Sequence, residues 1–257
     1  MKLFDTHCHF DFDEFQDDFE YNLKLAEEQG VSRILIPSVG HSNWSRIQTL
    51  AKQTPRLYYA LGFHPYFLDQ NFEHYLPQLE QHLSHECTQC VAIGECGLDF
   101  AIDVPVPLQE QALEIQFELA RRFNLPVVLH SRKAHNRLIQ MVKAAKLPKG
   151  GIVHAFSGSY QQAMEWVKLG FFIGVGGTIT YPRAKKTRDA IQKLALENLV
   201  IETDAPDMPI LGYQGQPNHP AKLIHVFNEL VELRSGKKQP IASQLWKNSN
   251  FAFRICE

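Results

Sequence analysis

Short apolar segments rich in β-branched residues alternate with amphipathic helical stretches along the whole chain. Several of them, such as Ile34-Leu35-Ile36 and Val127-Val128-Leu129, are continuously apolar, which is typical of parallel strands covered on both faces. We expect eight strands, at residues 2–6, 33–39, 57–62, 90–95, 126–130, 151–155, 171–175 and 199–203. We expect helices at residues 13–29, 42–53, 108–124, 134–147, 160–169, 183–196, 221–233 and 241–255.

Eight strands that alternate with helices in 257 residues predict an α/β fold, a closed (β/α)8 TIM-type barrel. An open, doubly wound sheet is the alternative that has the same alternation of elements. We find no linker-like or low-complexity stretch, and therefore expect residues 1–257 to form a single barrel domain.

The overall charge limits the kind of partner. A net charge of −2 and a pI of about 6.6 argue against a protein that coats long duplex DNA, although a local basic patch could still hold a strand end. Asp5 interrupts the N-terminus before an apolar signal core, and no apolar run approaches the roughly 20 residues of a membrane span. We expect a cytoplasmic, monomeric protein that needs neither a membrane nor an obligate protein partner.

The cysteines do not predict a disulfide framework. There are five of them at irregular spacing in a long chain. Cys87 and Cys90 have the spacing of a zinc knuckle, but no second pair follows them, so their role stays open.

Metal-ligand residue types stand at the carboxyl ends of five predicted strands. If Asp5-Thr6-His7-Cys8-His9 is extended, His7 and His9 share one face and Cys8 takes the other. The other strand ends carry Glu95, His130, His154 and Asp204. In a barrel these ends meet at one mouth, where active sites are built, so we expect one metal centre there.

Four histidines and two carboxylates exceed the three protein ligands of an open catalytic zinc site, which favours two divalent ions. Glu95 could bridge them with its two oxygens, and ions about 3.5–4 Å apart could activate a shared water. Imidazole-rich ligation suits Zn or Mn, and Mg could still function.

Other residues near the predicted mouth could contact a substrate phosphate, and each also has a simpler interpretation. His64 could contact the phosphate or leaving group or could support Pro65, and Arg132 could bind phosphate or be a solvated surface arginine. Ser157 precedes a helix N-terminus that could hold an anion. Arg183 starts a basic run that is either a solvated helix face or a footprint for nucleic-acid backbone.

Seven motifs together resemble the TatD-like metal-dependent hydrolases of the amidohydrolase superfamily, in order over nearly the whole chain. They are Asp5-Thr6-His7-Cys8-His9, Gly62-Phe63-His64-Pro65, Gly94-Glu95-Cys96-Gly97-Leu98-Asp99, His130-Ser131-Arg132, His154-Ala155-Phe156-Ser157-Gly158, Glu202-Thr203-Asp204-Ala205-Pro206 and Asn218-His219-Pro220. The resemblance implies that His7, His9 and Asp204 hold one ion, His130 and His154 the other, and Glu95 both. Tyr66 and Asn218 depart from residues common in that family, neither at a ligand position.

Three functions fit this pattern. The first is a two-metal phosphodiesterase, a deoxyribonuclease in which Asp204 and Glu95 are catalytic and DNA or another phosphodiester is the substrate. The second is a small-molecule amide, lactone or ester hydrolase on the same barrel. The third, a metal-binding protein without activity, fits poorly with a complete ligand set.

Overall fold

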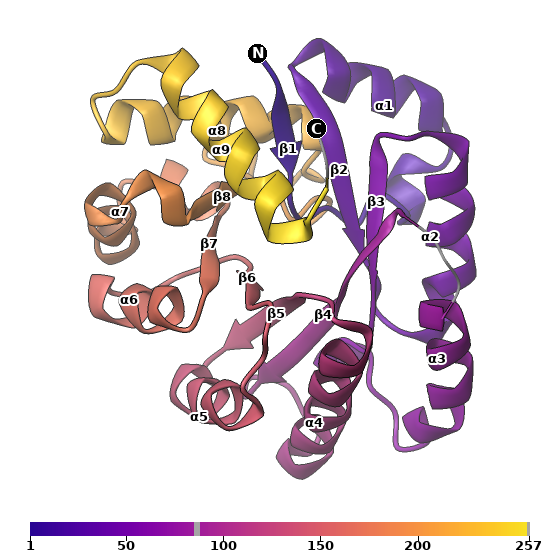
Figure 1. The fold of residues 1–257 in the computed structure, drawn as a ribbon. Coiled ribbons are helices and arrows are strands. Elements are labelled where there is room, and N and C mark those ends of the chain that lie inside the picture. The colour runs from indigo at the N-terminus through magenta and orange to yellow at the C-terminus, as the bar shows by residue number, and fades with distance from the viewer. Residues whose placement is uncertain (85–87, 256–257) are drawn as a thin grey trace.

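A computed structural model describes residues 1–84 and 88–255 of the chain, so Cys87 lies outside the described residues. Its strands and helices alternate around a barrel (Figure 1). The strands are β1 (Leu3–Asp5), β2 (Val31–Pro37), β3 (Leu57–Leu61), β4 (Cys90–Asp99), β5 (Val127–Arg132), β6 (Gly151–Val153), β7 (Phe171–Val175) and β8 (Leu199–Ile201). The helices are α1 (Phe19–Glu28), α2 (His41–Gln53), α3 (Leu76–Ser84), α4 (Val106–Phe123), α5 (His135–Ala145), α6 (Tyr160–Lys168), α7 (Lys185–Lys193), α8 (Leu223–Leu233) and α9 (Lys238–Phe253).

The eight strands pair in parallel and in sequence order from β1 to β8. Backbone hydrogen bonds also join the segment after β1 to the end of β8, from Thr6 N to the Ile201 carbonyl at 3.1 Å and from Asp204 N to the His7 carbonyl at 2.8 Å. These bonds bring the first and last strands together, which confirms the (β/α)8 barrel and excludes the open sheet.

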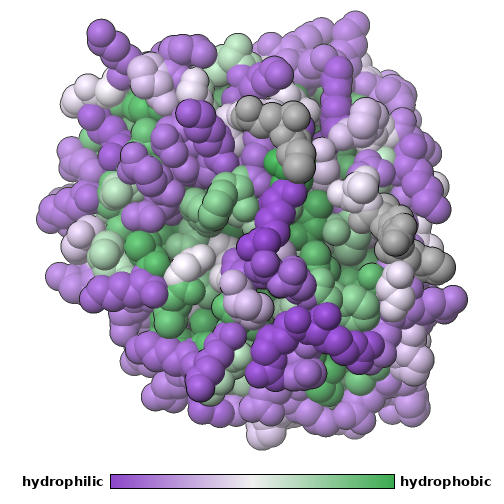
Figure 2. Space-filling model, in the orientation of Figure 1, coloured by the Kyte–Doolittle hydropathy of each residue, from purple (hydrophilic) through white to green (hydrophobic). Residues whose placement is uncertain are grey.

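The barrel interior is filled by apolar side chains from successive strands, including Phe4, Leu35, Ala60, Val128 and Val200, all buried. Ala252 and Phe253 of α9 belong to the same cluster, and α9 crosses one opening of the barrel (Figure 1). On the face drawn in Figure 2, hydrophilic side chains surround an apolar area near the middle. Because α9 crosses one opening of the barrel, the opening at the other end is the one left for a site. No helix within residues 1–84 and 88–255 is long and apolar enough to cross a membrane.

Two local predictions were wrong, and one helix was not predicted. The fourth strand does not end at Glu95 but continues to Asp99, because Gly97 lets β4 pass so close to β5 that a Cβ there would lie 2.0 Å from the His130 carbonyl oxygen. Helix α3 was not predicted, since its apolar positions span only nine residues. The first predicted helix is a 3-10 turn at Asp13–Phe15 followed by α1, with Asp18 as its N-cap.

Candidate metal centre

The predicted ligands converge at the opening away from α9. His7 and His9 follow β1, which ends at Asp5, and their rings lie 5.3 Å apart. Between them Cys8 is buried in the hydrophobic core, on the opposite side of the chain from the two histidines. Its burial raises the pKa of the thiol well above the usual value, so Cys8 is a packing residue.

Glu95 lies at the centre of the cluster and presents its two oxygens to different histidines. Its Oε2 is 3.0 Å from Nε2 of His7 and 3.7 Å from Nε2 of His9. Its Oε1 is 2.8 Å from Nε2 of His154 and 3.1 Å from Nδ1 of His130. One carboxylate thus separates these four histidines into two pairs. His7 and His9 follow β1, while His130 belongs to β5 and His154 follows β6.

Asp204 lies beside the first pair. Its Oδ1 is 3.4 Å from Nε2 of His7 and 3.9 Å from Nε2 of His9. The residue adopts a left-handed conformation with φ of 58°, and its backbone N–H donates to the His7 carbonyl. The strand-closing hydrogen bond therefore also fixes Asp204 against the first histidine pair.

Several buried polar atoms in this cluster lack a hydrogen-bond partner among the described residues. They include Nε2 of His7, Oε2 of Glu95 and Nδ1 of His154. The His7 and Glu95 atoms lie 3.0 Å apart without a hydrogen bond of acceptable geometry, an arrangement in which both can face one cation. A set of imidazole and carboxylate donors with such orphaned atoms fits divalent transition metals or magnesium.

The electrostatics of the first histidine pair and of Glu95 favour ligand-competent protonation states. Burial lowers the pKa of His7 to about 3, with further lowering from His154, and burial lowers the pKa of His9 to about 4. Burial alone would raise the pKa of Glu95, but the surrounding His154, His64 and His7 outweigh it and hold that pKa well below its usual value. At neutral pH His7 and His9 are neutral and Glu95 is ionised, as metal ligation requires.

His130 is held by a second carboxylate. Its Nε2 lies 3.1 Å from Oδ2 of Asp99, so Nε2–H donates to Asp99 and Nδ1 is turned toward Glu95. Burial opposes protonation of His130, yet its bonds to Asp99 and Glu95 raise its pKa to about 9. Asp99 thus orients the imidazole, as carboxylates often do for metal-ligating histidines.

A hollow of about 330 Å³ opens over the cluster, and two of the predicted substrate-binding residues line it. His64 has its Nε2 3.2 Å from Oε1 of Glu95, while its Nδ1 accepts a hydrogen bond from Tyr66 N. Arg132 is exposed, with its guanidinium 3.7 Å from Asp99. The exposed rings of Tyr66 and Phe67 also line the hollow.

The other two predicted substrate-binding residues lie elsewhere. Ser157 lines an adjacent cavity, and its hydroxyl is 3.4 Å from that of Thr187. Arg183 stacks on the ring of Tyr181 and lines a separate hollow with Met208. The structure therefore does not bring Arg183 to the hollow over Glu95.

Glu202 belongs to the surroundings of the centre and was not predicted. It is fully buried, accepts a hydrogen bond from Ala155 N, and lies 3.9 Å from Nδ1 of His154. Burial raises its pKa to about 8. The sequence signal for Glu202 was its place in the motif Glu202-Thr203-Asp204-Ala205-Pro206, two residues before Asp204. The alternation of side chains along a strand does not tell which neighbour Glu202 faces.

Eight parallel strands with histidines and carboxylates gathered at one mouth define a metallo-dependent barrel of the hydrolase type. The family model described as TatD related DNase matches residues 4–254, and the chain belongs to this TatD family of metal-dependent hydrolases. Its relatives include an uncharacterized metal-dependent hydrolase of Escherichia coli K12, YjjV, 48% identical over 99% of this chain and 98% of the relative. The crystal structure of YjjV, with 47% identity, superposes with a TM-score of 0.96 over 99% of this chain and 98% of that one. A 3'-5' ssDNA/RNA exonuclease, TatD, of Erwinia tasmaniensis is 30% identical over 98% of this chain and 100% of the relative.

Proposed function

We propose that the chain is a phosphodiesterase that hydrolyses DNA with two divalent ions, Zn, Mn or Mg. One observation carries the proposal: the two oxygens of Glu95 face two separate histidine pairs. His7, His9 and Asp204 would hold one ion, His130 and His154 the other, and Glu95 both. When bound, the ions would supply Lewis-acid stabilisation of the charge that develops on the phosphate.

Asp204 is suited to accept a proton from the attacking water. Burial raises its pKa well above the usual value, and the nearby charge of Glu95 adds to the effect. Its side chain also lines the hollow, so a water above the cluster can reach it. Its role is therefore that of a general base, next to its role as a ligand.

The walls of the hollow supply phosphate and base contacts. With Nδ1 of His64 accepting from Tyr66 N, Nε2 carries the proton, which faces Oε1 of Glu95 at 3.2 Å and could be shared with a phosphate oxygen bound there. Arg132 presents a guanidinium at the rim, and Tyr66 is exposed enough to stack on an unpaired base. These contacts favour a single-stranded end, the kind of substrate named for the Erwinia tasmaniensis relative.

Substitution of the shared carboxylate tests this function. Glu95→Gln and Asp204→Asn should abolish metal-dependent release of nucleotides from end-labelled single-stranded DNA, because each removes a charge from the centre. Glu114→Gln, on the exposed face of α4, is the matched control and should leave the rate unchanged. Full activity in either purified site variant would overturn the proposed mechanism.

A small-molecule ester, lactone or amide hydrolase is the second candidate. It is favoured by the charges around the hollow, because the carboxylates in its lining outnumber the arginine and disfavour a polyanion such as DNA. These carboxylates are Glu95, Asp99, Asp204 and Asp207, and the arginine is the exposed Arg132. Salt separates the two functions, because DNA cleavage should slow steeply as salt rises whereas hydrolysis of a neutral ester should not.

A further inference from the structure

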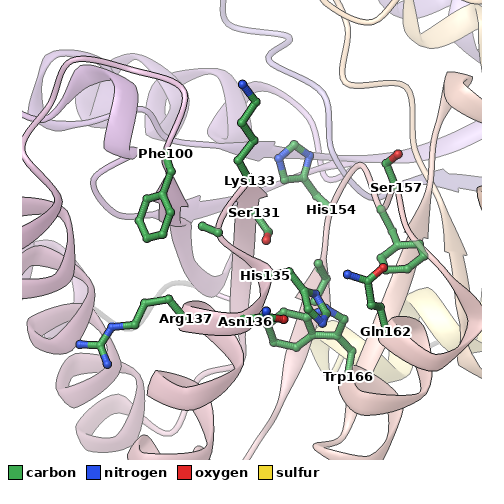
Figure 3. Close-up of a pocket in the computed structure, with 13 residues that line it drawn as sticks. Phe100, Ser131, Lys133, His135, Asn136, Arg137, His154, Ser157, Gln162 and Trp166 are labelled. Carbon is green, nitrogen blue, oxygen red and sulfur yellow. The ribbon is translucent and has the colours of Figure 1, made fainter.

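A second cavity, of about 430 Å³, lies beside the metal centre between the starts of α5 and α6 (Figure 3). His154 lines both this cavity and the hollow over Glu95, so its imidazole is part of a wall common to the two. A substrate held at the metal centre could therefore extend past His154 into the second cavity.

The second cavity differs from the first in charge. No Asp or Glu is among the described residues that line it, whereas four carboxylates line the hollow over the metal centre. The cavity is lined by one lysine and one arginine, and Arg137 is held in a bidentate ion pair by Glu110, with both distances 2.6 Å. Lys133 makes no ion pair within residues 1–84 and 88–255, so its charge is available to a ligand.

The start of α5 adds backbone donors. Ala134, at the N-cap, has no side-chain oxygen to cap the helix, and no side-chain cap is present. The first turn, with His135, Asn136 and Arg137, lines the cavity. Uncapped N–H groups and the positive end of the helix dipole favour an anion at this place.

Trp166 provides an independent sign of a ligand. Its side chain is fully buried, yet its indole N–H has no hydrogen-bond partner in the described part of the chain. Trp166 also lines the cavity, at the end opposite Lys133 and His154 (Figure 3). A buried donor without an acceptor is uncommon in folded proteins, and a ligand in the cavity could supply one.

We propose that this cavity binds a second, non-scissile phosphate of the substrate together with its nucleoside. Lys133 and the first turn of α5 hold the phosphate, and Trp166 donates a hydrogen bond to an acceptor atom of the same nucleotide. The cavity then fixes the neighbouring nucleotide while the phosphodiester to be cleaved lies over Glu95. This inference rests on the proposed phosphodiesterase function.

Binding is measured without catalysis. The full-length, chelator-treated protein is titrated with thymidine monophosphate and, separately, with inorganic phosphate, and the three tryptophan indole N–H signals are followed by NMR. Trp166→Phe identifies the Trp166 signal. We expect the nucleotide to shift that signal in the wild type and at least tenfold more weakly in Lys133→Glu. No shift, or a shift as strong with inorganic phosphate alone, overturns the proposal.

Kinetics then place the cavity on the substrate. The thymidine dinucleotide TpT is compared with pTpT and TpTp, which carry an extra terminal phosphate on one side or the other. The wild type should cleave one of these with kcat/KM roughly tenfold above that for TpT, the scale of one charge-assisted hydrogen bond. Lys133→Glu and Asn136→Asp should lose this preference, so that the ratio of kcat/KM for the phosphorylated dinucleotide to that for TpT falls toward unity.

Lys146→Glu is the matched control, because Lys146 is exposed at the other end of α5 and has a φ of 49°, close to the 54° of Lys133. It should keep the preference. An intact preference in Lys133→Glu and Asn136→Asp contradicts the inference. If no dinucleotide is cleaved, the proposed function fails, and the Trp166 signal alone decides whether the cavity binds a nucleotide.

Discussion

The imidazole of His130 is hydrogen-bonded to the carboxylate of Asp99, with 3.1 Å between Nε2 and Oδ2. This bond leaves Nδ1 facing Glu95 and His154. Asp99→Asn removes the charge that orients the ring, and we expect the affinity of the second divalent ion to fall by about 10–100-fold. Zinc titration of the chelator-treated protein measures this, with Asp103→Asn on the exposed loop after β4 as control. Unchanged affinity in Asp99→Asn would argue against Asp99 as an orienting group.

His64 lies close to the proposed ligands, and we propose that it acts as a hydrogen-bond donor to the substrate. His64→Asn keeps an acceptor for Tyr66 N and removes the Nε2 donor. We expect the variant to bind as many ions as the wild type while kcat/KM for DNA falls roughly 10–100-fold, as for loss of a hydrogen bond to a charged group. Loss of an ion on metal analysis would instead identify His64 as a ligand.

Asp5 and Thr203 join the first and last strands below the metal centre. The Thr203 hydroxyl donates to Oδ2 of Asp5 at 2.6 Å, and Thr203 N donates to Oδ1 at 2.9 Å. Thr203→Val leaves Oδ2 short of a donor in the core, and we expect a loss of about 1–3 kcal/mol in the free energy of unfolding. Urea denaturation measures it. Thr49→Val, on the exposed face of α2, should change stability by less than about 0.5 kcal/mol, and equal losses in the two variants would contradict this role.

His219 should make stability depend on pH. Burial, with a smaller effect of Lys222, lowers its pKa to about 4, and its Nδ1 accepts from Ala221 N. Between pH 6.5 and 4 the unfolded chain binds a proton that the folded one does not, so stability falls as pH falls through this window.

His219→Asn keeps the acceptor and removes the titration. Relative to this variant, the free energy of unfolding of the wild type should fall by on the order of 1–2 kcal/mol between pH 7 and pH 4. This figure allows for solvent screening of a half-buried group. Urea denaturation of both chelator-treated proteins across this range checks the difference. Parallel pH profiles for the two proteins would show that His219 titrates normally.

The barrel and the convergence of the strand-end residues could be predicted because parallel strands place their carboxyl ends at one mouth. His7 and Asp204 needed no more than this rule, whereas Glu95 lies inside β4 and not at its end. The extension of β4 depends on the contact between Gly97 and the His130 carbonyl, which joins residues 33 positions apart and leaves no local pattern.

The cavity beside the centre could not be predicted for a related reason. Its walls combine the first turn of α5 with Trp166 of α6, and only packing of the two helices brings them together. The sequence likewise suggested that Arg183 would face the substrate, because it follows β7. The guanidinium of Arg183 instead lies over the ring of Tyr181, 4.9 Å from its centroid.

The sharing of Glu95 between two ions is tested most directly by the number of divalent ions bound per chain, with their positions from anomalous scattering. We predict two ions in the wild type, one on each side of Glu95, and loss of at least one in Glu95→Ala. A single ion in the saturated wild type, or two ions retained in Glu95→Ala, would contradict the account.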